Sequence, residues 1–271
     1  MSVSTSKDAW SAQTYNKNAS FVYSDTFTSP VLSLLDPKPG EKIVDFGCGS
    51  GELTAKIGEV VTSGDEGVIV GVDSSENMLA KARLNGLKNL VRADLQAPLP
   101  ESELLPPHAF DAVFSNAAFH WCKRDPRGVL ANAKALLKKD GGRFVAEMGG
   151  YLNVVGVRSA LHEVLRKRGF DPVKLDPWYF PSDEEYRELL ESSGFEVQQI
   201  SLHPRMTTLP GRLYDWLVTF CRNSCLEAMS DEEAQAIMEE VEKICEVDCK
   251  DFKGRWTIMY VRLRFVAVVK T

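Results

Sequence analysis

The feature of this sequence that most restricts its fold is a short apolar segment, residues 42–46, that leads directly into a turn rich in glycine. The turn is GCGSG at 47–51, and apolar residues follow it at helical spacing from Leu53 to Val61. This order indicates a strand, a tight turn and a helix, because glycine turns the backbone sharply without steric cost. The segment therefore predicts a βα unit.

The alternation of strand and helix continues along the chain. Apolar runs bounded by turn residues predict further strands at 67–75, 90–95, 110–116, 141–150, 195–202 and 256–270. The cores of the first five strands are almost continuously apolar, which favours a parallel sheet covered by helices on both faces. The predicted fold class is α/β, with a doubly wound, seven-stranded sheet.

Helix start signals outside these units divide the chain further. Ser182-Asp183-Glu184-Glu185 and the segment from Ser230 to Glu233 have the pattern of capping boxes, and residues 211–253 are largely helical in pattern. We therefore expect a helical insertion between strands six and seven. The expected units are an N-terminal cap or lid segment at 1–36, a core at 37–203 and 255–271, and a helical substrate cap at 204–254.

Composition excludes several classes of protein. The 271 residues include 32 basic and 38 acidic side chains, a formal charge of −6, with no basic stripe of the kind that binds nucleic acid. No apolar run reaches the roughly 18–20 residues that span a bilayer. The first residues, MSVSTSKDAW, lack the apolar stretch of a secretory signal. We expect a cytoplasmic protein, monomer or homodimer, with no membrane or nucleic-acid partner.

The six cysteines allow two interpretations. Cys221 and Cys225 are four residues apart, as are Cys245 and Cys249, so four thiols on helices could meet around a soft metal or metalloid. Alternatively, they are small buried apolar side chains of amphipathic helices. Their spacing differs from the close pairs of structural zinc sites, which favours the second interpretation and predicts no metal.

Three aspartates follow or end consecutive strands: Asp45, Asp73 and Asp94. The turn beside Asp45 reads G-x-G-x-G, not the G-x-G-x-x-G of dinucleotide sites, and a carboxylate there would repel a pyrophosphate but suit an ammonium or sulfonium group. Asp73 is placed to bind ribose hydroxyls and Asp94 an adenine amino group. A single such aspartate is often only a helix N-cap, but three together indicate a ligand site.

Over residues 40–150 and 195–271, the chain resembles the class I S-adenosylmethionine-dependent methyltransferases. DFGCGSG corresponds to the family's first motif, Asp73 to its ribose-binding acid and Asp94 to its adenine-side acid. The resemblance implies a Rossmann-like sheet with an antiparallel last strand, S-adenosyl-L-methionine as cofactor and S-adenosyl-L-homocysteine as product. The implied cofactor residues are Asp45, Gly47, Cys48, Gly49, Gly51, Asp73, Ser74, Met78, Asp94, Leu95 and Asn116.

Other segments are similar to trans-aconitate methyltransferases. These are SNAAFHW at 115–121, the stretch from Trp10 to Tyr15, Trp216, and the ending RLRFVAVVK. Juvenile hormone acid methyltransferases share the His-Trp pair after the fourth strand. Both groups methylate carboxylates of small molecules, so the resemblance implies carboxylate O-methylation of a small molecule by in-line displacement.

Candidate residues for the acceptor side follow from position and type. Catalytic candidates are His120, Tyr15 and Trp121, and substrate-binding candidates are Trp10, Glu147, Trp178, Arg205 and Trp216. Arg212 and Arg222 are further candidates to hold a carboxylate. Each of these residues has an ordinary alternative as a packing, capping or solvated surface side chain.

The chemistry of the acceptor separates the functional alternatives. A carboxylate is ionised at neutral pH and needs no base, whereas a phenol or an amine needs one. Methylation of a phenol, an amine, a carbon or arsenic therefore stands as the alternative, with clustered thiols favouring arsenic. A catalytically silent subunit that only binds the cofactor is the alternative from another class.

Overall fold

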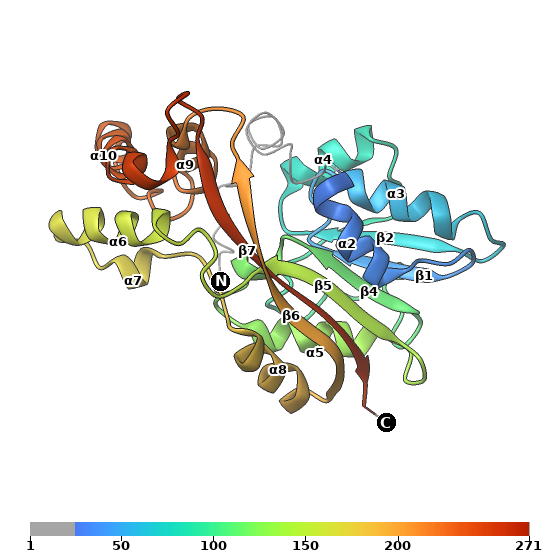
Figure 1. Ribbon diagram of the computed structural model, residues 1–271. Helices are drawn as coiled ribbons and strands as arrows, with labels where there is room; N and C mark the ends of the chain where they lie inside the picture. Colours follow the sequence, from blue (N-terminus) through green and yellow to red (C-terminus); the bar gives the residue numbers. More distant parts are fainter. Residues whose placement is uncertain (1–24, 271) are drawn as a thin grey trace, which may run out of the picture.

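The computed structural model describes residues 25–270, and its centre is one seven-stranded sheet in the order β3-β2-β1-β4-β5-β7-β6 (Figure 1). β1 to β5 run parallel, and β7 is antiparallel to both of its neighbours. The predicted fold class, with its antiparallel last strand, is confirmed. The strands are β1 (Lys42–Phe46), β2 (Val68–Asp73), β3 (Leu90–Arg92), β4 (Ala112–Asn116), β5 (Arg143–Gly149), β6 (Phe195–Thr208) and β7 (Thr257–Val269).

Helices cover both faces of the sheet (Figure 1). α2 (Asp25–Leu35) and α3 (Glu52–Val61) pack on one face, where buried side chains such as Ile43 and Phe114 meet them. α5 (Pro126–Leu136) and α8 (Asp183–Ser192) cover the other face, against alternate residues of the same strands. α4 (Glu76–Leu84) connects β2 to β3. This doubly wound arrangement buries strands on both sides, as their continuous apolar character predicts.

The predicted helix starts are confirmed by side-chain capping. Ser182 Oγ accepts a hydrogen bond from the Glu185 N–H at 3.0 Å, at the start of α8. Ser230 Oγ accepts one from the Glu233 N–H at 3.2 Å, at the start of α10 (Asp231–Cys249). Each serine thereby satisfies one of the N–H groups that a helix leaves unpaired at its first turn.

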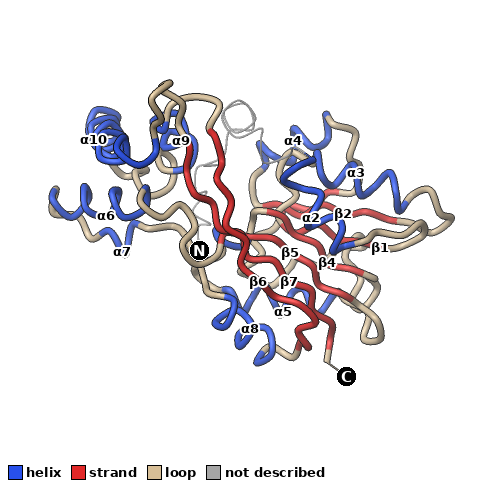
Figure 2. Tube along the Cα trace, in the orientation of Figure 1, coloured by secondary structure: helices blue, strands red, loops and turns tan. Residues whose placement is uncertain are grey.

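β6 and β7 pair along their whole length and extend beyond the rest of the sheet (Figure 2). β6 reaches Thr208, six residues past its predicted end at 202, so residues 204–208 lie in a strand and not in the helical insertion. The sequence pattern stops at Pro204, which normally breaks a central strand. β6 is the edge strand of the sheet, where a missing backbone N–H is tolerated.

The helices at the far end of this hairpin form a cap (Figure 1). α9 (Leu213–Phe220) and α10 come from the predicted insertion, while α6 (Val157–Lys167) and α7 (Pro172–Leu175) come from the chain between β5 and α8. A shared apolar core joins Val164 of α6 to Leu217 of α9 and Ile237 of α10. The cap is therefore built from two separate segments, of which the sequence analysis identified one. Among residues 25–270, no helix combines the length and apolar character that a membrane crossing requires.

Candidate active site

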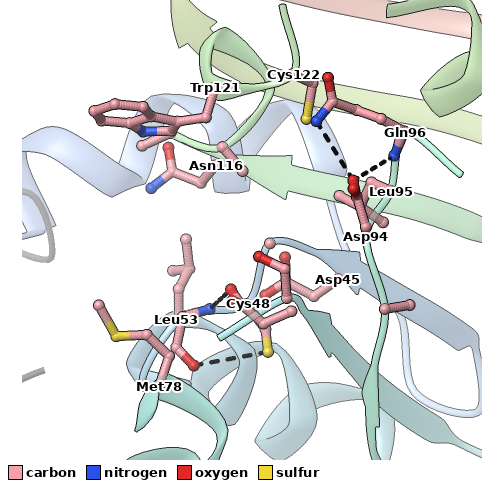
Figure 3. A pocket seen from close by; sticks show the side chains of 17 residues that line it. Asp45, Cys48, Leu53, Met78, Asp94, Leu95, Gln96, Asn116, Trp121 and Cys122 are labelled. Carbon is pink, nitrogen blue, oxygen red and sulfur yellow. Dashed lines mark hydrogen bonds between the residues drawn. The ribbon is translucent and has the colours of Figure 1, made fainter. Parts of the chain in front are cut away.

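A pocket opens at the carboxyl ends of β1, β2 and β4, where open α/β sheets bind ligands. The turn after β1 forms one wall, and Asn116 at the end of β4 and Trp121 beyond it lie on the opposite wall (Figure 3). Ten of the predicted cofactor residues line it: Asp45, Gly47, Cys48, Gly49, Asp73, Ser74, Met78, Asp94, Leu95 and Asn116.

The glycine turn has no room for side chains at its centre. Gly47 and Cys48 each donate a backbone hydrogen bond to the Val72 carbonyl, at 2.7 and 3.0 Å. Gly47 has a φ of 77°, and a Cβ added there would lie 2.2 Å from the Cβ of Ala118. Gly51 has a different place: it is the N-cap residue of α3, with a φ of 85°, and is not among the described residues of the pocket lining.

Asp73 fastens the turn to the end of β2. Its carboxylate accepts the Gly49 N–H and the Ser75 N–H, both at 2.9 Å, one on each oxygen. A carboxylate is an acceptor that suits the hydroxyl donors of a ribose. Asp73 thus both shapes the turn and offers acceptors to a ligand in the pocket.

Asp94 lies just beyond β3, at the end of the pocket away from Met78 (Figure 3). It accepts hydrogen bonds from the Gln96 N–H at 2.9 Å and from Arg124 Nη2 at 2.6 Å. Partial burial works to raise the pKa of Asp94, but the hydrogen bond and positive charge of Arg124 hold that pKa below its ordinary value. Asp94 is therefore a fixed anion at neutral pH.

Asp45 behaves differently because it is only 3% exposed. Burial raises the pKa of Asp45 to about 7, the neighbouring charge of Asp73 adds to that effect, and the hydrogen bond from Thr54 Oγ1 at 2.6 Å opposes it. A positive ligand would remove much of the cost of ionising this carboxyl. The end of the pocket near β1 is therefore suited to a positively charged ligand group.

Asn116 adds an acceptor across the pocket from Asp45. Its Oδ1 is buried and has no hydrogen-bond partner within the part of the chain that the structure describes. An unpaired buried carbonyl oxygen is costly, and an ammonium group of a ligand would satisfy it. This set of acceptors fits a ligand with ribose hydroxyls, amino groups and positive charge, as S-adenosylmethionine has.

A second, aromatic cavity adjoins this pocket and shares Ala117 and Trp121 with it. His120 is buried in its wall, and its Nδ1 accepts the Gly149 N–H at 3.2 Å. Burial, together with the nearby charge of Arg262, lowers the pKa of His120 well below its ordinary value, so the ring is neutral at pH 7. Because Nδ1 is the acceptor, the single ring proton is on Nε2.

The other acceptor-side candidates have distinct places. Trp178 and Trp216 line the aromatic cavity together with His120 and Trp121. Glu147 forms ion pairs with two arginines of β7, Arg262 at 3.2 Å and Arg264 at 2.5 Å. Glu147 is thus held inside the protein by these ion pairs, and it is not among the described residues that line the aromatic cavity.

The remaining candidate arginines lie in different parts of the structure. Arg205 lies in β6 opposite Tyr260 of β7, where burial and the charge of Arg262 lower the pKa of Arg205 to about 10. Arg212 pairs with Glu242 and Arg222 with Asp231 on the cap. The Trp10 and Tyr15 candidates and most of the expected 1–36 lid segment lie outside the described residues.

Comparisons with known proteins agree with this geometry. A profile of the methyltransferase domain family matches residues 44–144. An uncharacterized methyltransferase of Schizosaccharomyces pombe is 33% identical over 267 residues, which cover 96% of this chain and 98% of the relative. A trans-aconitate 2-methyltransferase of Agrobacterium fabrum is 28% identical over 276 residues, covering 97% of this chain and 100% of the relative.

Solved structures share the fold. A presumed methyltransferase from Bacillus halodurans superposes with a TM-score of 0.61 at 16% identity, covering 91% of this chain and 100% of that chain. Phosphoethanolamine N-methyltransferase 2 of Haemonchus contortus, in complex with S-adenosylhomocysteine, gives a TM-score of 0.55 at 18% identity, covering 96% of this chain and 57% of that chain.

The chain belongs to the class I S-adenosylmethionine-dependent methyltransferases. The predicted family, enzyme class and cofactor are confirmed. The methyltransferase uses S-adenosylmethionine as methyl donor.

The cysteines of the methyltransferase do not gather at one place. Cys225 Sγ hydrogen bonds to the Cys221 carbonyl at 3.7 Å, while Cys245 and Cys249 interact with each other. Between residues 25 and 270, no group of three or more histidine, cysteine, aspartate or glutamate side chains could hold a metal ion. Cys221 and Cys225 lie in the turn that follows α9, not on a helix as the spacing suggested, and both are buried with Cys245 of α10 in the apolar core of the cap.

Several cavity residues of the methyltransferase were missed by sequence reasoning. Arg262, Asn153, Phe220 and Tyr260 all line the aromatic cavity. The arginine had a signal, because it is a charged residue inside an apolar strand that the sheet buries. No comparable sequence signal marks Asn153, because it lies in a loop whose conformation depends on hydrogen bonds with β7. In one of them, the Val261 N–H donates to Asn153 Oδ1 at 2.9 Å.

Proposed function

We propose that this methyltransferase transfers a methyl group to a carboxylate oxygen of a small organic acid. The observation that carries the proposal is the fixed protonation of His120, whose Nδ1 accepts the Gly149 N–H at 3.2 Å. His120 therefore offers Nε2–H as a donor and has no lone pair with which to take a proton from an acceptor. An acceptor that is already ionised fits such a site.

The other titratable groups in the described lining of the cavity support the same conclusion. Burial raises the pKa of Tyr260, and its hydroxyl already accepts a hydrogen bond from Trp216 Nε1 at 2.7 Å. Arg262 is positive, which disfavours an ammonium group beside it. A phenol or an amine would find no base among these residues, whereas a carboxylate needs none.

The proposal assigns the large pocket to the cofactor. Asp73 would bind the ribose hydroxyls, Asp94 the adenine amino group, and Asp45 with Asn116 the positive end of the methionine part. The bound cofactor supplies a methyl group on a sulfonium centre. An acceptor oxygen in the adjoining cavity forms the new O–CH₃ bond, and the electron pair of the broken S–CH₃ bond stays on sulfur, so no net proton moves.

His120, Trp121 and the residues they contact would orient the acceptor. The His120 Nε2–H can donate to one carboxylate oxygen while the other faces the methyl group. Trp121 lies in both the pocket and the cavity and would separate the acceptor from solvent. Relatives whose names give trans-aconitate as their substrate support a carboxylate acceptor for this chain.

The test uses S-adenosylmethionine labelled in its methyl group and a panel of small carboxylic acids, phenols and amines. A carboxylate acceptor gives a methyl ester, from which mild alkali releases labelled, volatile methanol. Methyl ethers and N-methyl amines keep their label under that treatment. Label that resists alkali in every product would contradict the proposal, and cofactor binding without transfer across the panel would favour the silent subunit.

The role of His120 has its own test. In His120→Gln, the side-chain amide can still donate from a position like that of Nε2, so we expect kcat/KM to remain within about tenfold of the wild type. In His120→Leu the donor is lost, and we expect a further drop of at least tenfold. The wild-type kcat should also stay flat between pH 6 and 8. A kcat that rises with pH, together with equal loss in both variants, would assign His120 as a base instead.

A further inference from the structure

Arg262 of β7 is a buried cation in the wall of the aromatic cavity. It is 3% exposed, yet its guanidinium donates no hydrogen bond to any residue in the range 25–270, and its Nε is buried without a hydrogen-bond partner. Its contacts are the ion pair with Glu147 at 3.2 Å and the face of the Tyr260 ring, 5.3 Å from the ring centroid. A buried guanidinium normally uses several of its five N–H donors, so this one is prepared for an additional acceptor.

The charges around Arg262 do not balance within the described residues. Glu147 is also the ion-pair partner of Arg264, whose Nε lies 2.5 Å from the Glu147 carboxylate. Two guanidinium groups thus share one carboxylate, and Arg205 lies close enough to affect the same charges. Burial of a net positive charge is costly unless an anion joins it. One carboxylate of a ligand would supply that anion.

The rest of the cavity wall is aromatic. Trp121, Trp178, Phe180, Trp216, Phe220 and Tyr260 line it, from four different segments of the chain. Ring centroids lie 6.0 Å apart for Trp121 and Trp178, 6.4 Å for Trp121 and Phe220, and 4.8 Å for Trp216 and Phe220. These separations are typical of rings in contact, so the rings form a continuous apolar wall against which a flat apolar group can pack.

Such a wall offers little to a second charged or hydroxylated group. His120 is neutral, and Arg262 is the cation among the described lining residues. A second carboxylate on the ligand would therefore be buried against ring faces without a counter-charge. Asn153, which is 4% exposed and also lines the cavity, provides an amide donor beside Arg262.

We propose that Arg262 binds the single carboxylate of the methyl acceptor and that the acceptor is a monocarboxylic acid with a flat, apolar body, aromatic or unsaturated. Glu147 acts as a positioning residue that holds the guanidinium toward the cavity. This inference rests on the proposed function and narrows it to one class of acid. It differs from what the trans-aconitate relatives would suggest, because trans-aconitate has three carboxylates.

The test measures binding rather than turnover, so that it does not depend on methyl transfer. Protein saturated with S-adenosylhomocysteine is titrated with cinnamate, its neutral amide and trans-aconitate, and binding is followed by calorimetry and by quenching of tryptophan fluorescence. We expect cinnamate to bind at least tenfold more tightly than the amide and more tightly than trans-aconitate. Tighter binding of trans-aconitate, or no preference for the acid over the amide, would overturn the inference.

Variants then assign the preference to Arg262. In Arg262→Met we expect the acid and the amide to bind within about threefold of each other, with S-adenosylhomocysteine affinity unchanged as evidence of a folded cofactor pocket. Arg262→Lys keeps a charge without the fork of donors and should keep part of the preference. Arg212→Met, which removes a cap arginine paired with Glu242, is the matched control and should behave as the wild type.

The experiments distinguish failure of the proposed function from failure of the inference about Arg262. If the acid binds through Arg262 but no alkali-labile methyl ester forms in the transfer assay, the proposed function fails and the binding inference stands. If esters form but the acid preference survives in both Arg262 variants, the proposed function stands and the inference about Arg262 fails.

Discussion

Burial of Asp45 links the ionisation of its carboxyl to the binding of a ligand. The carboxyl is 3% exposed, and its pKa is about 7, compared with 3.8 for an exposed aspartate. Below pH 7 the empty pocket therefore holds a neutral acid, and above it an anion. A sulfonium or ammonium ligand favours the anion, so ligand binding and loss of the Asp45 proton are linked.

The affinity for S-adenosylmethionine should therefore rise with pH through the pKa of Asp45. With a pKa of about 7 in the free protein and a much lower one in the complex, the ionised fraction rises about eightfold between pH 6 and pH 7.5. We expect Kd to fall by a similar factor, with release of a proton on binding. Calorimetry in buffers of different ionisation enthalpy measures both quantities.

Asp45→Asn is the control for this prediction. It should bind the cofactor weakly at every pH and lose the eightfold change. Its unliganded form should be more stable than the wild type at pH 8. The folded pKa of Asp45 lies above the unfolded value, so ionisation costs stability as pH rises above about 4, and the full cost, about 4 kcal/mol, is present above pH 7. A variant that binds normally would contradict the assignment of Asp45.

At the scale of elements, the cap depends on one apolar seam between helices of distant segments. Ile237 of α10 is fully buried there, beside Val164 of α6 and Leu217 of α9. Ile244, about two turns further along the same helix, is 41% exposed. The two isoleucines separate the effect of core packing from that of helix propensity.

Ile237→Ala should destabilise the protein by about 2–4 kcal/mol, since it opens a cavity in the seam. Ile244→Ala should change stability by less than about 0.5 kcal/mol. Urea unfolding measures both. Because Ile237 belongs to the cap, we also expect a higher KM for the acceptor but S-adenosylhomocysteine affinity within about twofold of the wild type. Equal loss of both affinities would mean that the seam also supports the cofactor pocket.

The elements differ in how far the sequence predicts them. The sheet, the capped helices and the cofactor pocket follow from local signals, because strand-end aspartates of a parallel sheet meet at one edge. The extension of β6 past Pro204 was not predictable, since it depends on β6 being an edge strand. α6 has clear helical periodicity at Val157, Leu161 and Val164, but its partner α10 begins more than sixty residues later. The position of α6 in the cap depends on tertiary packing, which local sequence patterns do not give. The same is true of the position of Arg262 in the cavity wall.

At the scale of the whole molecule, the cofactor pocket belongs to the sheet and the aromatic cavity to the junction of sheet and cap. Trp121 and Ala117 line both, so they are the physical link between the two ligand sites. Ala117 has a φ of 59°, unusual for a residue other than glycine, and its N–H donates to the Glu147 carbonyl at 2.7 Å. Ligand binding at one site can therefore affect the other site through the segment that contains Ala117 and Trp121.

Hydrogen exchange should resolve the two ligand sites. S-adenosylhomocysteine at about one hundred times its Kd stabilises the fold by about 2.7 kcal/mol, and we expect the local slowing of exchange at residues 47–51, 93–96 and 116–122. Exchange in α10 should change only when an acceptor acid is also present. Equal protection of α10 by S-adenosylhomocysteine alone would contradict the division into two sites.

The long pairing of β6 with β7 has a mechanical consequence. β5 pairs with β7 only from Arg262 onward, so residues 257–261 and their partners 204–208 continue past β5 as a two-stranded ribbon, roughly 17 Å long, which the loop after β5 contacts through hydrogen bonds from Gly150 N–H to the Val261 carbonyl and from Val154 N–H to the Met259 carbonyl. Such a ribbon bends and twists more easily than a wide sheet. Tyr260 lies in the ribbon and moves with the cap through its hydrogen bond to Trp216, whereas Arg262 lies where β7 pairs with β5, so a bend of the ribbon would change the space between the tyrosine ring and the guanidinium.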